Sequence, residues 1–114
     1  MLLITSRETK RWVIPKGWPM VGLKDFTSAK REALEEAGVA GQISKASVGT
    51  YGYEKRIKAG DTLNCTVVVF PLQVKTMLRN WKEKHERTRS WFSAEEAAKL
   101  VQEPALKTII ETLV

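Results

Sequence analysis

The sequence predicts an α+β fold in a single domain over residues 1–114, and three observations lead to this prediction. Short apolar segments of strand character stand at the start of the chain and again in its middle. Helical periodicity appears once early and twice near the end, so strands and helices do not alternate as in a doubly wound sheet. The chain has no internal repeat, and its length is that of one domain. This order of elements favours a mixed or antiparallel sheet.

The first half of the chain predicts two short strands, a loop and a helix. The strands cover residues 2–5 and 12–14, and prolines and glycines indicate an irregular loop over 15–24. A helix over 25–37 follows, because its apolar residues recur at helical spacing, and Gly38 is placed to end it. The apolar stripe of this helix consists of Phe26, Ala29, Ala33 and Ala37.

The second half of the chain predicts four more strands, at residues 42–45, 47–57, 62–74 and 90–92. A turn over 58–61 joins the two longest of them into a hairpin. The apolar run from Val67 to Phe70 predicts a strand centre that is buried on both faces. Residues 79–89 are polar and charged, which is typical of a loop.

Two helices are predicted to close the chain. Ser93 and Glu96 have the spacing of a capping box, so a helix begins after Ser93 and runs to about Gln102. Pro104 suits the first turn of a last helix that runs through Val114.

Composition excludes several classes of protein. Nineteen Lys and Arg against 13 Asp and Glu give a formal net charge of +6, so an anionic partner is expected. Without a nucleic-acid motif, a nucleic acid, such as an RNA 5′ end, is a weaker alternative than a phosphorylated small molecule. The lone Cys65 excludes an internal disulfide and favours a reducing, cytoplasmic setting. The sequence has no apolar run long enough for a membrane-spanning helix, so no membrane partner is expected.

One segment departs from the basic balance. Residues 25–38 carry a net charge of −2, which leaves +8 for the rest of the chain. Within this segment, Glu32, Glu35 and Glu36 fall within about 100° of arc, opposite the apolar stripe. A hard divalent cation such as Mg²⁺ or Mn²⁺ would relieve the repulsion between these carboxylates. A solvated acidic face is the alternative interpretation of the same spacing.

The surroundings of these carboxylates resemble the Nudix box, the family motif G-x5-E-x7-R-E-U-x-E-E-x-G-U in which U is apolar. Eight of its nine defined positions match at the spacing of the motif between residues 17 and 39. The matching residues are Gly17, Arg31, Glu32, Ala33, Glu35, Glu36, Gly38 and Val39. Leu23 stands where the family has its first glutamate. Residues 6–17 and 89–97 also resemble the diphosphoinositol polyphosphate phosphohydrolase branch of the family.

The resemblance implies a Nudix-type α/β/α sandwich with a mixed sheet that lacks part of the usual N-terminus. It implies a pyrophosphohydrolase that uses Mg²⁺ or Mn²⁺ to cleave a diphosphate bridge. The branch favours a highly phosphorylated substrate, either a diphosphoinositol polyphosphate or a diadenosine polyphosphate. The residues assigned to catalysis are Glu32, Glu35, Glu36, Arg31 and Glu86, and the three helix glutamates are also the expected metal ligands. Arg31 would orient a glutamate, and Glu86, or else Glu83, would help to activate water.

Basic residues around the loop ahead of the helix are predicted to hold phosphate oxygens. They are Arg7, Arg11 and Lys16, and Trp18 would pack on a substrate ring beside them. Ordinary surface charge remains the alternative for each cation.

Two further expectations follow from features of the family that this sequence lacks. Because Leu23 replaces a box glutamate, the alternative function is a catalytically weak Nudix-fold module that binds a phosphorylated ligand. A sheet edge left incomplete at the N-terminus favours a homodimer.

Overall fold

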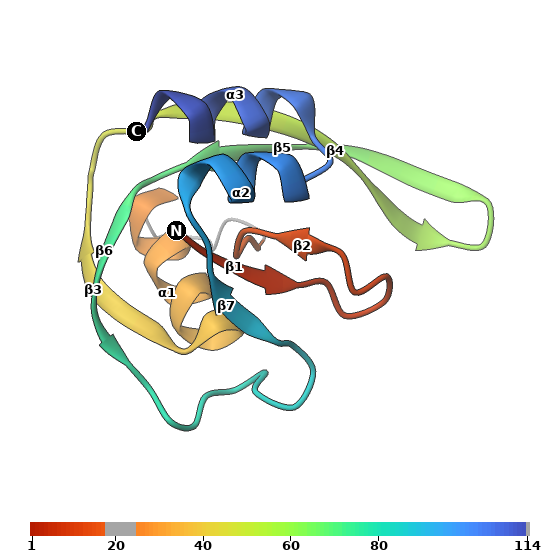
Figure 1. The fold of residues 1–114 in the computed structure, drawn as a ribbon. Helices are drawn as coiled ribbons and strands as arrows, with labels where there is room; N and C mark the ends of the chain where they lie inside the picture. Colours follow the sequence, from red (N-terminus) through yellow and green to blue (C-terminus); the bar gives the residue numbers. More distant parts are fainter. Residues whose placement is uncertain (18–24, 114) are drawn as a thin grey trace.

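The computed structural model describes residues 1–17 and 25–113, and these residues confirm the α+β class (Figure 1). Their helices are α1 (Asp25–Ala37), α2 (Ala94–Leu100) and α3 (Pro104–Thr112). Their strands are β1 (Leu2–Thr5), β2 (Trp12–Val13), β3 (Val39–Ile43), β4 (Gly49–Lys58), β5 (Asp61–Val69), β6 (Leu72–Met77) and β7 (Arg89–Trp91).

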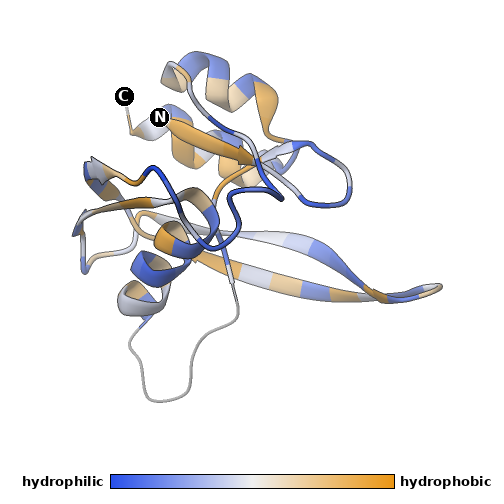
Figure 2. Cartoon of the chain, turned by 90° about the horizontal axis from the view of Figure 1, so that it is seen from below, coloured by the Kyte–Doolittle hydropathy of each residue, from blue (hydrophilic) through white to orange (hydrophobic). Residues whose placement is uncertain are grey.

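Strand β1 lies between the helices, and its successive side chains face opposite layers. Leu3 packs with side chains of α2 and α3, whereas Ile4 packs with side chains of α1, and both are fully buried. Trp12 and Val13 of β2 divide between the same two clusters. Figure 2 shows β1 as hydrophobic along its length. Helices therefore cover both faces of this sheet, which confirms the α/β/α sandwich.

The strands form three small sheets, in the orders β2-β1-β7, β3-β6 and β4-β5. In the central sheet, Ile4 pairs with Val13 on one side and with Arg89 on the other. All pairings among the described residues are antiparallel, so the expected mixed sheet is corrected to antiparallel ones. Short turns join β1 to β2 and β4 to β5, as suits antiparallel neighbours, whereas β3 pairs with β6 and β1 pairs with β7 across long intervening segments.

The predicted strand over 62–74 is divided into β5 and β6 at Phe70 and Pro71. Proline has no N–H for a ladder, which explains why β5 ends here and β6 continues with a new partner, β3. The expected burial of 67–70 on both faces is wrong. Val67 and Val69 pack against the α2/α3 cluster, but Val68 is 38% exposed because it points to the opposite face.

The two closing helices begin where the sequence predicts. The Glu96 N–H donates to Ser93 Oγ at 3.1 Å, and the reciprocal bond from the Ser93 N–H completes the capping box. Pro104 is the first residue of α3, and Thr112 is its last. Among the described residues, no helix has the length and apolar character needed to cross a membrane.

Shortening one buried side chain of the central strand β1 tests this packing. We expect Leu3→Ala to lower the free energy of unfolding by roughly 2–5 kcal/mol, because the cavity would lie between β1 and the α2/α3 layer. The control is Leu63→Ala on the β4–β5 hairpin, where the side chain is 42% exposed and less than about 1 kcal/mol is expected. Urea unfolding followed by circular dichroism measures both. Equal losses for the two variants would contradict the assigned core.

Candidate active site

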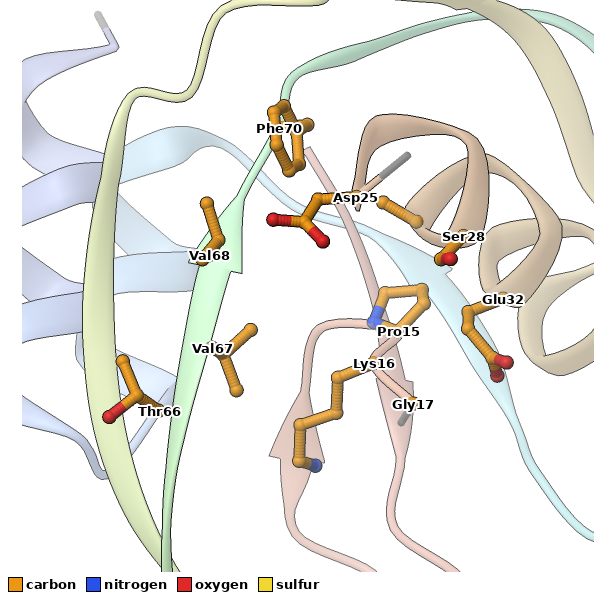
Figure 3. Close-up of a pocket in the computed structure, with 11 residues that line it drawn as sticks. Pro15, Lys16, Gly17, Asp25, Ser28, Glu32, Thr66, Val67, Val68 and Phe70 are labelled. Carbon is orange, nitrogen blue, oxygen red and sulfur yellow. The ribbon is translucent and has the colours of Figure 1, made fainter. Parts of the chain in front are cut away.

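The segment that follows β2 approaches α1 closely at Gly17. A Cβ atom at residue 17 would overlap the carboxylate of Glu32, so a larger residue here would require the Glu32 side chain to move. The neighbouring Lys16 N–H donates to Glu36 Oε1 at 3.3 Å. Figure 3 shows Lys16 and Gly17 between Glu32 on α1 and the residues of β5. One stretch of backbone therefore lies against two carboxyl groups of the helix.

Glu32 and Glu36 lie one turn apart on α1, and their carboxyl groups are close enough to interact. Glu36 is only 6% exposed. Burial is the main reason that the pKa of Glu36 rises to about 7; the Glu32 contact adds to the rise and the Arg87 guanidinium opposes it. Two carboxyl groups in contact need a proton or a cation between their oxygens. The pair therefore has the chemistry of a cation site.

Glu35 does not join this pair. Its carboxylate lies 3.5 Å from Arg31 Nε and 3.9 Å from Lys82 Nζ, and Glu35 is not among the residues that line the cleft described below. Of the three glutamates expected to cluster, only Glu32 and Glu36 are brought together, because Arg31 and Lys82 hold Glu35. Arg31 does pair with a box glutamate, as the resemblance implies.

Arg87 is a site residue that the sequence analysis missed. Its side chain is 10% exposed, and its Nε lies 2.8 Å from Glu83 Oε1. One terminal nitrogen lies 3.7 Å from Glu36 Oε1, and the other donates to the Thr5 carbonyl at 3.2 Å. Arg87 therefore holds the late loop, β1 and α1 together. Nothing in the sequence separates it from the other charged residues of 79–89.

The late-loop acid that reaches the site is Glu83. Arg87 draws it inward, so that its side chain is 15% exposed. Glu86, the acid favoured by the sequence analysis, is half exposed and lies 3.8 Å from Arg7. Glu86 is not among the residues that line the cleft. The structure thus brings the alternative loop acid, rather than the favoured one, to Glu36.

Two further residues hold the C-terminal end of α1. Gly38 has a φ of +65°, and a side chain there would meet the Trp81 ring. The Trp81 Nε1–H donates to the Glu36 carbonyl at 3.1 Å. The Arg89 guanidinium stacks on the same ring at 4.0 Å and donates to the Ala37 and Gly38 carbonyls at 2.9 and 3.0 Å. Cationic donors at this end satisfy helix carbonyls that have no partner within the helix.

A cleft of about 740 Å³ opens beside these carboxyl groups. Glu32 and Glu36 lie on one wall, residues 6–9 and 11 of the β1–β2 turn on a second, and residues 53–56 of β4 on a third. Glu83 and Arg87 also line it.

The cations predicted to bind substrate all line this cleft, but they differ in their partners. Arg11 Nη1 is paired with Glu103 at 2.9 Å, and Arg7 lies 4.0 and 3.8 Å from Glu83 and Glu86. The Lys16 Nζ lies 4.8 Å above the Tyr53 ring, and burial lowers its pKa. Trp18 and Leu23 lie outside the described residues.

The residues present fit a divalent metal in part. Glu32 and Glu36 offer the oxygen ligands that Mg²⁺ and Mn²⁺ prefer. Their carboxyl groups repel each other when both are ionised, and a bound cation would relieve that repulsion. Within residues 1–17 and 25–113, however, no three His, Cys, Asp or Glu side chains are grouped to hold an ion. The role of Glu35 as a third ligand stays a prediction.

Comparison with known proteins gives matches over most of the chain. The family model described as the NUDIX domain matches residues 1–113. Nudix hydrolase 21, chloroplastic, of Arabidopsis thaliana is 30% identical over 114 residues, which is 100% of this chain and 56% of that protein. Diphosphoinositol polyphosphate phosphohydrolase 3-alpha of Mus musculus is 31% identical over 104 residues, 90% of this chain and 59% of that protein.

A solved structure has the same fold. It is the C. elegans Ap4A hydrolase binary complex, with a TM-score of 0.66 and 20% identity. The alignment covers 98% of this chain and 81% of that one. The chain thus spans less than three fifths of the length of the two curated relatives and most of the solved structure.

The shifted pKa of Glu36 predicts how stability depends on pH. The folded protein keeps Glu36 protonated up to about pH 7, whereas the unfolded chain loses that proton near 4.5. The free energy of unfolding of the metal-free protein should therefore fall, by on the order of 2 kcal/mol, between pH 5 and 7.5 relative to Glu36→Gln. Urea unfolding of both proteins in chelator measures this. Parallel pH profiles would show that the Glu36 pKa is not raised.

Proposed function

Because this chain belongs to the Nudix family, we propose that it is a metal-dependent pyrophosphohydrolase. It would cleave a diphosphate bridge in a highly phosphorylated small molecule, of the diphosphoinositol polyphosphate or diadenosine polyphosphate type. The observation that supports this most is the contact between Glu32 and Glu36 at the edge of a large cleft, whose lining holds six cationic and five acidic side chains.

In this proposal, Glu32, Glu36 and, after leaving its ion pairs, Glu35 hold one or more Mg²⁺ or Mn²⁺ ions. A metal bound there supplies neutralisation of the diphosphate and acidification of a water. Glu83, or else Glu86 as the sequence favours, would accept a proton from the attacking water. Arg31 and Arg87 are positioning residues, because each contacts a carboxylate of the set.

The substrate class is supported by charge. Outside 25–38 the chain carries +8, and the cleft walls hold several of these cations. The name of the mouse relative refers to diphosphoinositol polyphosphate. Dense polyanions fit such a cleft, and electrostatic attraction would also speed their association.

The alternative proposal is a module that binds a phosphorylated ligand with little or no turnover. The observation that favours it is Leu23 at the position of the first box glutamate. This module would keep the cleft and its cations but lack a complete set of acids.

The predicted setting is cytoplasmic, and the predicted assembly is a homodimer through free strand edges; both stay predictions. The curated relatives include proteins named chloroplastic and mitochondrial. An apolar cavity of about 490 Å³ where the three sheets meet, lined in part by the exposed Val68 and Trp91, suits the dimer.

Loss of one box carboxylate tests the proposed reaction. We expect Glu36→Gln to lower kcat by at least about 100-fold with Mg²⁺ or Mn²⁺, because the metal loses a charged ligand. Phosphate release would be measured on diadenosine polyphosphates, a diphosphoinositol polyphosphate, ADP-ribose and nucleoside triphosphates. The control, Glu95→Gln on exposed α2, should keep kcat within about twofold. Absence of metal-dependent turnover on every compound by the folded wild-type protein would reject the enzyme.

Restoring the missing acid separates the enzyme from the binding module. If the chain is an enzyme, Leu23→Glu should raise kcat/KM by roughly tenfold, because it completes the acid set around the metal. Leu23→Gln is the control of similar size without charge. Turnover that stays absent in Leu23→Glu, with metal binding shown by calorimetry, would favour the module.

A further inference from the structure

The C-terminal end of α1 carries two of the box glutamates in an electrostatically unfavourable place. Glu35 and Glu36 belong to the last turn of the helix, and that turn has no basic residue of its own. The carbonyl end of a helix carries a partial negative charge, so it repels carboxylates, and its last carbonyls have no partners within the helix. The donors and cations that this end needs must therefore come from another part of the chain.

The late loop, residues 79–89, supplies donors to successive carbonyls at this end of α1. The Glu83 N–H donates to the Glu35 carbonyl at 3.1 Å. The Trp81 Nε1–H donates to the next carbonyl, that of Glu36, also at 3.1 Å. The loop is therefore aligned with the helix residue by residue, and the bond from Trp81 lies only two residues before the loop acid Glu83.

Arg89 adds further donors from the end of the loop. Its Nη1 donates to the Ala37 and Gly38 carbonyls at 2.9 and 3.0 Å, and its Nη2 donates to the Leu78 carbonyl at 2.7 Å. The guanidinium group also lies 4.0 Å from the centroid of the Trp81 ring. Because a planar guanidinium group can stack on a ring while it donates in several directions, this one side chain holds both ends of the loop at the helix.

The loop that is held in this way carries two charged side chains into the site. Arg87 Nε lies 2.8 Å from Glu83 Oε1, and Arg87 Nη2 lies 3.7 Å from Glu36 Oε1. Glu83 and Arg87 line the cleft, whereas Trp81 and Arg89 are not among its lining residues. A shift of the loop along α1 would therefore move these two side chains relative to Glu36.

We propose that Trp81 and Arg89 are positioning residues, whose bonds to the end of α1 set where Glu83 and Arg87 lie relative to Glu36. They act through these groups and need no contact with the substrate. A misplacement of about 1 Å can lower the rate of a reaction by about 100-fold, so small shifts of the loop matter. The effect on turnover rests on the proposed function, whereas the geometric role does not.

Amide hydrogen exchange in the metal-free protein, followed by NMR, tests the geometry without any reaction. The variant is Trp81→Phe, which keeps an aromatic ring beside Arg89 and removes the bond to the Glu36 carbonyl. We expect the Lys16 amide, which donates to the Glu36 carboxyl group, to exchange about five- to tenfold faster. Amides of the β1–β2 pair, which report global opening, should keep their rates. The matched control is Trp91→Phe, at an exposed position of β7, which should leave the Lys16 rate unchanged.

Two outcomes would overturn the positioning role. An unchanged Lys16 rate in Trp81→Phe would show that the bond from Trp81 does not hold Glu36 in place. Exchange of the β1–β2 amides that is faster by the same factor would show that Trp81 supports the whole fold rather than the site.

Kinetics measures the consequence for turnover. If the chain is the proposed enzyme, Arg89→Lys should lower kcat by roughly tenfold and change KM by less than about twofold, because the acids shift while the substrate contacts stay. The matched control is Arg79→Lys in the same loop, which is exposed and outside the cleft lining, and it should keep kcat within about twofold. An unchanged kcat in Arg89→Lys, or a loss that falls on KM alone, would contradict the role of Arg89. An inactive wild-type protein would reject the proposed enzyme, yet the exchange rates would still decide whether Trp81 holds Glu36.

Discussion

The rest of the site depends on the contact between the carboxyl groups of Glu32 and Glu36, which the surrounding residues must hold together against their repulsion. Two acids one helical turn apart are common on exposed helices, where water keeps both ionised. Here Glu36 is buried, and its pKa of about 7 reflects chiefly the cost of charging it away from water; Arg87 opposes this rise, and the contact with Glu32 adds to it. The fold maintains this contact by placing Gly17 against one carboxyl group and a backbone N–H against the other. A side chain at position 17 would displace the Glu32 carboxyl group from its present place beside Glu36.

The same acids depend on how firmly α1 is held at its C-terminal end. Arg89 belongs to β7, which pairs with β1, so its bonds to the Ala37 and Gly38 carbonyls connect the helix to the central sheet. Trp81 adds a bond to the carbonyl of Glu36 itself. The buried alternation of Leu3 and Ile4 keeps β1 in one register, because a slip by one residue would exchange the two clusters. The packing that fixes the register of β1 therefore also fixes the position of α1 and of its carboxyl groups.

The parts of the site that follow from local spacing were predictable. A helix places Glu36 beside Glu32 whatever surrounds it, and the capping box at Ser93 is equally local. Arg87 was not predictable, because its partners Thr5 and Glu36 come from distant parts of the chain. The division of the long predicted strand at Pro71 had a signal in the sequence, but the exposure of Val68 depends on which layer covers each face.

The number of cationic residues around this cleft does not show how much of their charge is available to a ligand. Arg7 and Arg11 have the residue type and the place expected of phosphate ligands, and the structure surrounds them with acids. The Arg11–Glu103 pair is largely buried and resists exchange for a ligand, because the displaced carboxylate would lose its partner in a partly desolvated place. A lysine on an aromatic ring gives up less, since the ring contact persists while the ammonium group also contacts an anion. Of the cations predicted to bind substrate, Lys16 on Tyr53 is therefore better suited to meet an anion than Arg11.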